Sequence, residues 1–299
     1  MNHNCKVDFM GIGTTKSAST WIAKCLDEHP EICVSKPKEP HFFYKDEEYQ
    51  DGGGVDKYYE KYFNHCDIGS IKGEFSVDYI DYPKVAGRVK KHFPDIKLII
   101  SLRNPIDRAY SNYWYFKNIY NILEDTFEEA LKNHEGLIRR GFYASNLQEF
   151  LKLFPRENFL FVIYEDIKKD SVKFIQQIYK FLEVDENFCP PSVQKKIWVT
   201  SHEQYPFIKI NKFKINLIKF CKKNFLLKYF IRLLKWAGLE NLVQRPFAIL
   251  AKKGYKEADA KSFQKPPIKS DTRKFLQETY KNEIKNMEKI LDRDLSFWK

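Results

Sequence analysis

The sequence of 299 residues is 43% hydrophobic and carries a net charge of +11, so it can bury a full core and favours an anionic partner. Such a partner is a nucleotide, an acidic glycan, nucleic acid or an anionic membrane, although a general preference for lysine would also explain much of the charge. No run reaches the roughly 20 apolar residues of a membrane span, and the first residues lack the apolar stretch of a signal peptide. The six cysteines show no metal-binding spacing, so we expect reduced thiols, no metal ion and a cytoplasmic protein.

Predicted strands and helices alternate along the chain. The apolar run Val7–Met10 predicts a first strand, and apolar residues at helical spacing from Trp21 predict the helix after it. Further strands are predicted at 32–34, 97–102 and 158–164. Helices are predicted at 83–92, 105–118, 126–133, 143–154 and 273–291, and another helix follows residues 165–166 and ends at about 182. The alternation predicts a single α/β domain over residues 1–299, with a parallel sheet and helices on both faces.

A basic and apolar stretch, 212–236, lies within a segment at about 200–260 that carries no motif. Its lysines and arginines fall on two helical faces whose phase slips near Asn224, which predicts two amphipathic helices. We expect a helical lid or an acceptor-side segment here. Its basic faces would either stay solvated or contact an anionic acceptor or a membrane surface.

The loop between the first strand and the first helix, Gly11–Trp21, reads GIGTTKSASTW. Free backbone N–H groups and the helix dipole favour an anion at such a place, and Lys16 adds a full charge. Hydroxyl donors follow at Ser17, Ser19 and Thr20. A triphosphate loop would need glycine at positions 10 and 15, and a dinucleotide fingerprint would need it at position 16. The loop therefore predicts a site for a phosphate ester, or else an ordinary turn with a surface lysine.

A second phosphate-binding pattern follows the predicted strand at 97–102. Arg103 leaves the carboxyl end of this strand, the edge at which α/β sheets bind ligands, and Asn104 and Pro105 suit the cap and first position of a helix. Ser111 lies eight residues after Arg103, a little over two helical turns on. Two anion sites at the ends of two strands predict a ligand with two phosphate-like ends.

With both segments in view, the chain resembles the sulfotransferases that use 3′-phosphoadenosine 5′-phosphosulfate (PAPS). The first motif of that family, which holds the 5′-phosphosulfate, is matched by KSASTW at 16–21, with Ala18 where the family usually has glycine; alanine suits a helical first turn. The second motif, an Arg and a Ser on the 3′-phosphate, is matched by Arg103 and Ser111. The resemblance covers nearly the whole chain and implies a nucleotide-kinase-like P-loop fold. The implied PAPS-binding residues are Thr14, Thr15, Lys16, Ser17, Ala18, Ser19, Thr20, Trp21, Arg103, Ser111 and, in the late loop, Lys265.

Two further matches indicate the glycosaminoglycan-type branch of the family. Lys36–Phe43 reads KPKEPHFF and is similar to a Lys-Glu-x-His-Phe-Phe segment in which the Glu is the catalytic base. Gly73–Tyr79 reads GEFSVDY and is similar to Gly-Glu-x-Ser-Pro-x-Tyr, with Val77 in place of proline. The final Leu291–Trp298 is similar to the end of bacterial members.

The resemblance implies two catalytic roles. Lys16 neutralises charge on the leaving phosphate oxygen, and Glu39 takes the proton of the acceptor, a task that a raised pKa would favour. Without the resemblance, Glu39 would be interpreted as a salt-bridge partner of Lys36 or Lys38. His41 is a second candidate base or orienting residue, or else a packed structural histidine.

Three other residues are weaker candidates. Glu74 and Asp78 are lesser candidates for the acid–base chemistry. Trp21 offers an aromatic face for the adenine or belongs to the core.

The sequence thus predicts a sulfotransferase that moves a sulfuryl group from PAPS to a hydroxyl, less readily an amine, of a glycan, a glycolipid or a small molecule. The nucleotide product is adenosine 3′,5′-bisphosphate, no metal is needed and no nucleic acid is expected as a partner. The alternatives are a P-loop kinase of nucleotides or metabolites and a non-catalytic polyanion-binding protein. We expect a cytoplasmic location, with a peripheral contact to an anionic membrane through about 212–236 as an option.

Overall fold

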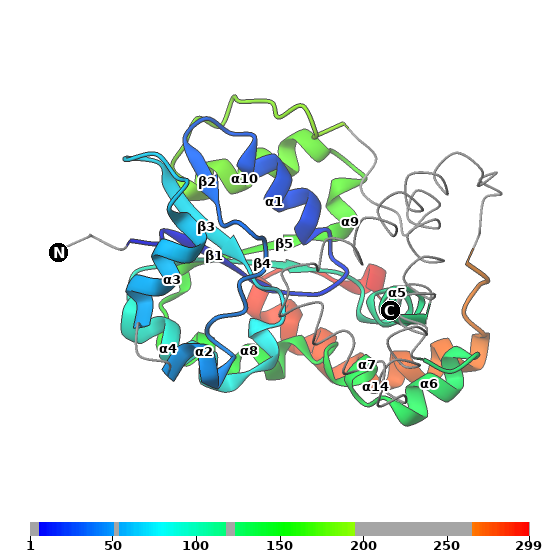
Figure 1. The fold of residues 1–299 in the computed structure, drawn as a ribbon. Helices are drawn as coiled ribbons and strands as arrows, with labels where there is room; N and C mark the ends of the chain where they lie inside the picture. The colour runs from blue at the N-terminus through cyan, green and yellow to red at the C-terminus, as the bar shows by residue number, and fades with distance from the viewer. Residues whose placement is uncertain (1–5, 51–53, 118–122, 195–264, 299) are drawn as a thin grey trace, which may run out of the picture. The chain divides into compact units, whose positions relative to one another are not determined.

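The computed structural model describes residues 6–50, 54–117, 123–194 and 265–298 (Figure 1). The described part divides into two compact units, Met1–Ser111 with His134–Ile197 and Lys269–Lys299, and Asn112–Asn133 with Trp198–Ile268. The segment at 200–260, with the amphipathic helices expected at 212–236, lies outside the described residues, so the predicted domain organisation stays a prediction. Within the described ranges, no helix combines the length and the apolarity that crossing a bilayer requires.

The first unit is built on a five-stranded sheet in the order β2-β3-β1-β4-β5, and every neighbouring pair is parallel. The strands are β1 (Phe9–Gly13), β2 (Ile32–Val34), β3 (Ile71–Phe75), β4 (Lys97–Leu102) and β5 (Phe159–Ile163). The central strand β1 pairs with β3 on one side and with β4 on the other, so the order of the strands reverses beside β1. In open α/β sheets, ligands bind at the carboxyl edge next to this reversal.

Helices cover both faces of the sheet, as predicted (Figure 1). One face carries α1 (Ser19–Asp27) and α10 (Ser171–Leu182), whose apolar sides share one buried core with β1 and β5. The other face carries α4 (Pro83–His92), α8 (Tyr143–Leu153) and α14 (Ser270–Leu291). The remaining helical elements of this unit are short, apart from α3: α2 (Asp46–Gln50), α3 (Gly54–Phe63), η1 (Tyr79–Asp81), α7 (Gly136–Arg139), η3 (Arg156–Asn158), α9 (Tyr164–Ile167) and η5 (Ser296–Trp298).

Local sequence signals explain several of these boundaries. The helix predicted at 83–92 is confirmed as α4, with proline at its first position. Strand β3 was not predicted, because IKGEF is neither continuously apolar nor alternating, and four of its five residues are nevertheless buried. Gly11 is also fixed by packing, since a Cβ at this position would lie 2.1 Å from the ring of Phe75.

The helix α5 (Pro105–Tyr115) begins in the first unit and ends in the second, which also holds α6 (Phe127–Asn133). The side chain of Asn104 caps α5 by accepting from the backbone N–H of Ile106 at 2.9 Å, as its position before Pro105 predicts. Thr126 caps the start of α6: its hydroxyl accepts from the backbone N–H of Glu129 at 3.2 Å and donates to the Glu129 carboxylate at 2.8 Å.

Candidate active site

Three segments that follow strands of the sheet lie at its carboxyl edge. The loop Thr14–Ala18 follows β1, Arg103 follows β4, and the loop Ser35–Phe43 follows β2. The predicted phosphate and acid–base residues of the first unit therefore arise from one edge of one sheet.

The two predicted phosphate segments are joined by hydrogen bonds. The guanidinium Nη1 of Arg103 donates to the backbone carbonyl of Lys16 at 3.1 Å, and the backbone N–H of Thr14 donates to the carbonyl of Ser101 at 2.8 Å. Arg103 also stacks over the ring of Tyr164, with 4.4 Å between the guanidinium carbon and the ring centroid. This arrangement brings the cation of the second motif directly against the loop of the first.

Several donors at this junction have no partner inside the described protein. The Arg103 Nε atom and the Thr15 hydroxyl are buried without a hydrogen-bond partner. The first residue before α1, Ala18, supplies no side-chain cap, and no acidic residue occupies the first turn, so the positive end of the helix dipole is not neutralised locally. Unpartnered buried donors and an uncapped helix start are what phosphate oxygens would satisfy, so the residues fit the nucleotide that the sequence predicts.

Two hydroxyls of the loop serve the protein itself. The Ser17 hydroxyl is fully buried and donates to the Ser101 carbonyl at 2.7 Å, and the Thr14 hydroxyl donates to the same carbonyl at 3.1 Å. These two residues can therefore bind a phosphate only through their backbone. Thr20 is exposed, whereas Ser19 is buried.

The backbone at Ala18 differs from the expectation of a helical first turn. Ala18 lies in the left-handed region, with φ 69° and ψ 15°, and Lys16 has φ 66°. Glycine adopts this region without the clash between Cβ and carbonyl that other residues suffer. The conformation explains physically why related loops carry glycine at this position.

Ser111 is buried on α5, about 9 Å along the helix axis from Pro105. The backbone behind Arg103 is held by two further contacts. The Tyr143 hydroxyl donates to the Arg103 carbonyl at 2.9 Å, and the backbone N–H of Asn104 donates to Glu165 at 3.0 Å. Arg103 thus lies in the connection between β4 and α5, and Ser111 lies on α5 itself.

The acid–base candidates form a chain of contacts in the loop after β2. One carboxylate oxygen of Glu39 forms an ion pair with Lys38, and the other lies 3.4 Å from His41 Nε2. Glu39 and His41 both have left-handed backbone, with φ 64° and φ 57°. The Nδ1 atom of His41 is buried without a partner in the described protein.

The pKa of Glu39 is lowered, whereas a raised pKa would favour the task of a base. Burial raises this pKa, but the hydrogen bond from His41 and the charge of Lys38 outweigh burial and lower the pKa to about 2. The ion pair with Lys38 is the alternative that the sequence offers for Glu39, and the contact with His41 adds to it. Glu39 is ionised at neutral pH, and its basicity is held down as long as Lys38 contacts it.

The lesser candidates lie beside this loop. Glu74 is fully buried and accepts hydrogen bonds from the hydroxyls of Tyr58 and Ser76 at 2.7 and 2.5 Å. Asp78 is ion-paired with Arg140 at 2.8 Å. Neither carboxylate lacks partners, so both have structural roles in the described protein.

Trp21 lies in the core. It is 3% exposed, its indole N–H donates to the Ser192 carbonyl at 3.0 Å, and its ring packs against Phe174. The ring therefore has no exposed face for an adenine, and the core interpretation holds. Lys265 belongs to the second unit, so its role toward the nucleotide stays a prediction.

The cysteines depart from the expectation of reduced thiols. Cys33 on β2 and Cys66 after α3 form a disulfide, while Cys25 is free and buried. The sequence did not reveal the pair because the two residues are 33 positions apart and meet only through the packing of α3 beside β2. With His65 they also form a group of potential metal ligands whose ligand atoms lie within 4.8 Å of one another, but here the two sulfurs are bonded to each other.

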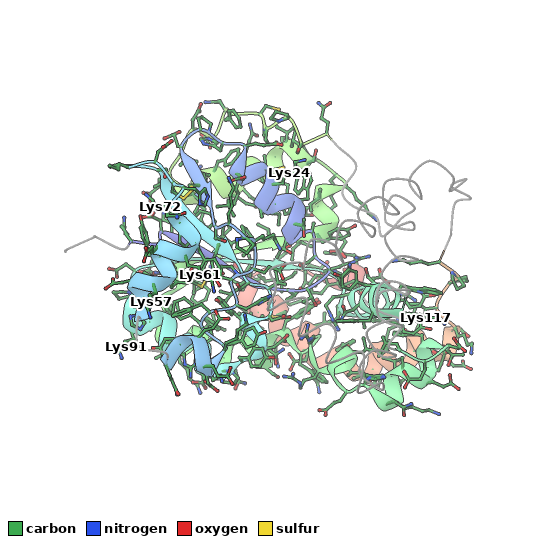
Figure 2. All side chains as sticks on the ribbon, viewed as in Figure 1. Lys24, Lys57, Lys61, Lys72, Lys91 and Lys117 are labelled. Atoms are coloured by element: carbon green, nitrogen blue, oxygen red, sulfur yellow. A yellow bond between two sulfur atoms is a disulfide. The ribbon has the colours of Figure 1, made fainter. Side chains whose placement is uncertain are left out.

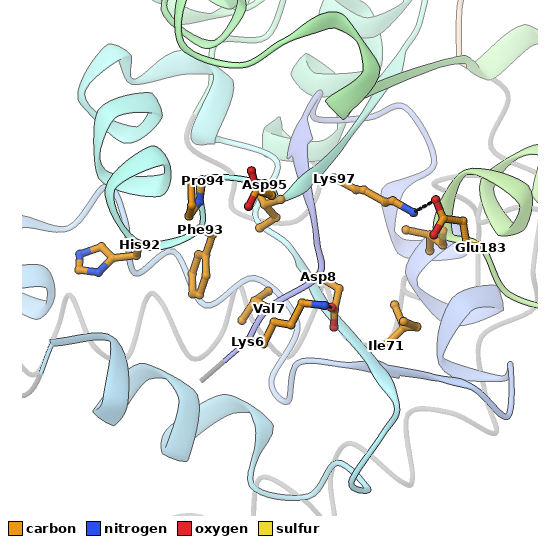
Figure 3. A pocket seen from close by; sticks show the side chains of 12 residues that line it. Lys6, Val7, Asp8, Ile71, His92, Phe93, Pro94, Asp95, Lys97 and Glu183 are labelled. Carbon is orange, nitrogen blue, oxygen red and sulfur yellow. Dashed lines mark ion pairs between the residues drawn. The ribbon is translucent and has the colours of Figure 1, made fainter. Parts of the chain in front are cut away.

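A cavity of about 500 Å³ lies at the opposite, amino edge of the sheet (Figure 3). Four of its charged side chains form two ion pairs, Lys6 with Asp8 at 2.8 Å and Lys97 with Glu183 at 3.0 Å. It contains none of the predicted site residues, and we assign it no role in the chemistry.

Lysines of the described region are spread over several elements (Figure 2). Those labelled include Lys24 on α1, Lys57 and Lys61 on α3, Lys72 on β3 and Lys91 on α4. The positive charge is therefore distributed over several helices and strands.

Comparison with models of protein families shows to which family the chain belongs. A model of the sulfotransferase domain matches residues 6–217, which include both phosphate segments and the loop of Glu39. The chain belongs to the sulfotransferase family. The resemblance inferred from the motifs is thereby confirmed.

The curated relatives of this sulfotransferase include heparan sulfate enzymes. It is 28% identical over 178 residues to the human heparan sulfate glucosamine 3-O-sulfotransferase 6, covering 57% of this chain and 50% of that protein. It is 26% identical over 203 residues to the bifunctional heparan sulfate N-deacetylase/N-sulfotransferase 1 of Caenorhabditis briggsae, covering 60% and 23%. The chain thus spans about half the length of these relatives or less.

A solved structure shares the fold of this chain. The sulfotransferase from Alicyclobacillus acidocaldarius superposes with a TM-score of 0.66 at 21% identity, covering 98% of both chains. This likeness, with the parallel sheet, confirms the predicted sulfotransferase fold.

Sequence reasoning missed the residues that support the Arg103 loop from behind. Glu165, in the first turn of α9, accepts from the backbone N–H of Asn104, and its other oxygen accepts from the Trp298 indole at 3.2 Å. The Asn104 amide in turn donates to the Trp298 carbonyl at 3.0 Å. An acidic residue directly after the strand predicted at 158–164, at the ligand edge of the sheet, was the signal available in the sequence.

Proposed function

We propose that this sulfotransferase moves a sulfuryl group from PAPS to a hydroxyl of a glycan, with an amine, a glycolipid or a small molecule as further acceptors. The observation that carries the proposal is the hydrogen bond between Arg103 and the Lys16 carbonyl, which joins two anion-binding segments around unpartnered buried donors. A ligand with two phosphate-like ends suits this junction. The glycan class is supported by the heparan sulfate relatives and by the net charge of +11, which favours an acidic acceptor.

The residues that would hold the donor are the backbone of the loop 14–18, Thr15, Lys16, Arg103 and Ser111. When bound, PAPS supplies the sulfuryl group and a bisphosphate leaving group. Lys16 stabilises negative charge that develops on the leaving side, and the N–H groups at the start of α1 bind anionic oxygens without needing to reorient. Arg103 and Ser111 fix the other phosphate and so orient the donor.

The proton of the acceptor hydroxyl goes to the Glu39–His41 pair. Glu39 is ionised and touches His41 Nε2, so it orients the imidazole or takes the proton itself once Lys38 is drawn to another anion. The pH dependence of turnover separates the two roles: proton transfer to the Glu39 carboxylate leaves the rate level at neutral pH and above, whereas a rate that falls as an imidazole protonates identifies His41.

The test is transfer of label from PAPS to a panel of acceptors: desulfated heparan sulfate, a glycolipid and a small phenol. Lys16→Ala should lose most of the transfer, while Lys24→Ala, an exposed lysine of α1, is the matched control and should retain it. Near-normal transfer by Lys16→Ala would contradict the role of the loop.

The location of the protein in the cytoplasm and a contact between 212–236 and a membrane remain predictions. The Cys33–Cys66 disulfide bears on the first of these, because disulfides persist mainly in oxidising compartments.

A further inference from the structure

The loop that carries Glu39 and His41 has a backbone that needs external support. Both residues have left-handed φ values, a conformation in which the Cβ of any residue other than glycine clashes with the backbone. Pro40 stands between them and supplies no N–H donor. Contacts from elsewhere in the fold must therefore keep the loop in place.

Two side-chain hydroxyls accept backbone N–H groups of this loop. The His41 N–H donates to the Ser76 hydroxyl at 3.0 Å, and the Phe43 N–H donates to the Tyr79 hydroxyl at 3.2 Å. Ser76 directly follows β3, and Tyr79 begins η1, so both acceptors come from the segment after the neighbouring strand.

Both hydroxyls donate to the same buried carboxylate. Ser76 donates to Glu74 Oε2 at 2.5 Å, and Tyr79 donates to Glu74 Oε1 at 3.1 Å. A hydroxyl has one hydrogen, and an ionised carboxylate can only accept. Glu74 therefore accepts a hydrogen bond from each hydroxyl. The lone pairs of the two hydroxyl oxygens remain to accept from the N–H groups of His41 and Phe43.

We propose that Glu74 is a positioning residue for the Glu39–His41 pair and acts through the hydroxyls of Ser76 and Tyr79. The proposal rests on the proposed function for what the pair does, but the support of the loop is a property of the fold. Glu74 is fully buried, so it acts through these hydroxyls rather than on the acceptor.

The surroundings of Glu74 act on its charge in two directions. Burial has the largest effect and leaves the pKa of Glu74 raised from its usual value, although hydrogen bonds from Ser76, Tyr58 and Tyr79 and the charge of His41 act in the opposite direction. The facing groups are thus three hydroxyls and one imidazole. The polarity argument uses the hydrogen bonds from Ser76 and Tyr79, and the Tyr58 bond is not part of it.

Two buried tyrosines provide a matched pair for the test. Tyr58 and Tyr79 both donate to Glu74 Oε1, but only the Tyr79 hydroxyl accepts an N–H of the loop. Tyr79→Phe and Tyr58→Phe each remove one buried hydroxyl and one bond to Glu74. Only the first disconnects the loop.

The experiment measures amide hydrogen exchange of residues 36–44, affinity for adenosine 3′,5′-bisphosphate, and sulfuryl transfer to desulfated heparan sulfate. In Tyr79→Phe we expect loop amides to exchange about tenfold faster and transfer to fall about tenfold, with bisphosphate affinity unchanged. Tyr58→Phe should match the wild-type protein in all three. Glu74→Gln should resemble Tyr79→Phe in exchange, because an amide group cannot accept at both positions.

Loop exchange that is equally fast in both tyrosine variants, or unchanged in both, would overturn the proposal. If the wild-type chain bound no bisphosphate and transferred no label, the proposed function would fail. The exchange comparison would still decide whether Glu74 supports the loop.

Discussion

The replacement Glu39→Gln removes a charge on which both the stability and the chemistry of the site depend. The carboxylate has Lys38 on one oxygen and His41 on the other, and glutamine keeps the shape of the side chain without the charge. We expect the variant to fold and to bind adenosine 3′,5′-bisphosphate, since Glu39 lies on the loop after β2 and not on the phosphate segments. Transfer should fall about 10²- to 10⁴-fold, the usual contribution of a positioned acid–base group.

The effect on stability follows from the pKa. A pKa of about 2 in place of 4.5 corresponds to about 3.4 kcal/mol, at about 1.36 kcal/mol for each tenfold change. The Glu39 side chain is 32% exposed, so water screens part of this interaction and we expect about 2 kcal/mol. Because the folded pKa is lower than the unfolded one, this contribution is complete above pH 4.5 and is lost as the pH falls toward 2.

Urea unfolding of wild type and Glu39→Gln at pH 7, 4.5 and 3 measures the difference. It should be largest at pH 7 and shrink at pH 3. Glu149→Gln, which breaks a surface pair with Lys152, is the control and should change the free energy of unfolding by less than about 0.5 kcal/mol. Equal stability of Glu39→Gln and wild type at every pH would refute the ion-pair argument, and full turnover in the folded variant would refute the acid–base role.

Three further predictions concern the phosphate segments and the disulfide. Arg103→Ala should weaken binding of adenosine 3′,5′-bisphosphate by about 1.5–3 kcal/mol and reduce the difference in affinity between this nucleotide and adenosine 5′-phosphate. If calorimetry finds that difference unchanged, Arg103 does not bind the 3′-phosphate. Ala18→Gly should raise the free energy of unfolding by about 0.5–1 kcal/mol, because relief of the left-handed strain exceeds the added chain entropy, and a loss of stability in urea would contradict this. Reduction of the Cys33–Cys66 disulfide, which spans 33 residues, should lower the free energy of unfolding by up to about 3.7 kcal/mol. Cys189→Ser, at an exposed free cysteine, should leave that response to reductant unchanged, whereas Cys66→Ser should abolish it.

The phosphate segments were predictable because their signals are local. A strand, a Lys-containing loop and a helix start are adjacent in sequence, and the same holds for β4, Arg103 and the Asn104 cap. The direct bond between Arg103 and Lys16 then follows from the parallel pairing of β1 with β4, which brings the two strand ends together.

The features that escaped prediction depend on the conformation of loops and on contacts between segments. The low pKa of Glu39 requires knowing that Lys38 and His41 both face its carboxylate, which the loop backbone decides. The disulfide of Cys33 depends on the packing of α3, and the bonds of Glu74 depend on the pairing of β2 with β3. The helical spacing of Trp21 is the same whether it stacks on an adenine or packs in the core. Only its burial in the structure indicates the core.

The central claim is that the loop after β1 and Arg103 after β4 form one site for a bisphosphorylated adenosine. Isothermal titration of the full chain with adenosine 3′,5′-bisphosphate in the presence of EDTA tests it most directly, with adenosine 5′-phosphate and ATP plus Mg²⁺ as comparisons. We predict metal-independent binding of the bisphosphate, at least tenfold tighter than that of adenosine 5′-phosphate. Absence of bisphosphate binding, or binding of ATP that depends on Mg²⁺ and exceeds it, would contradict the account.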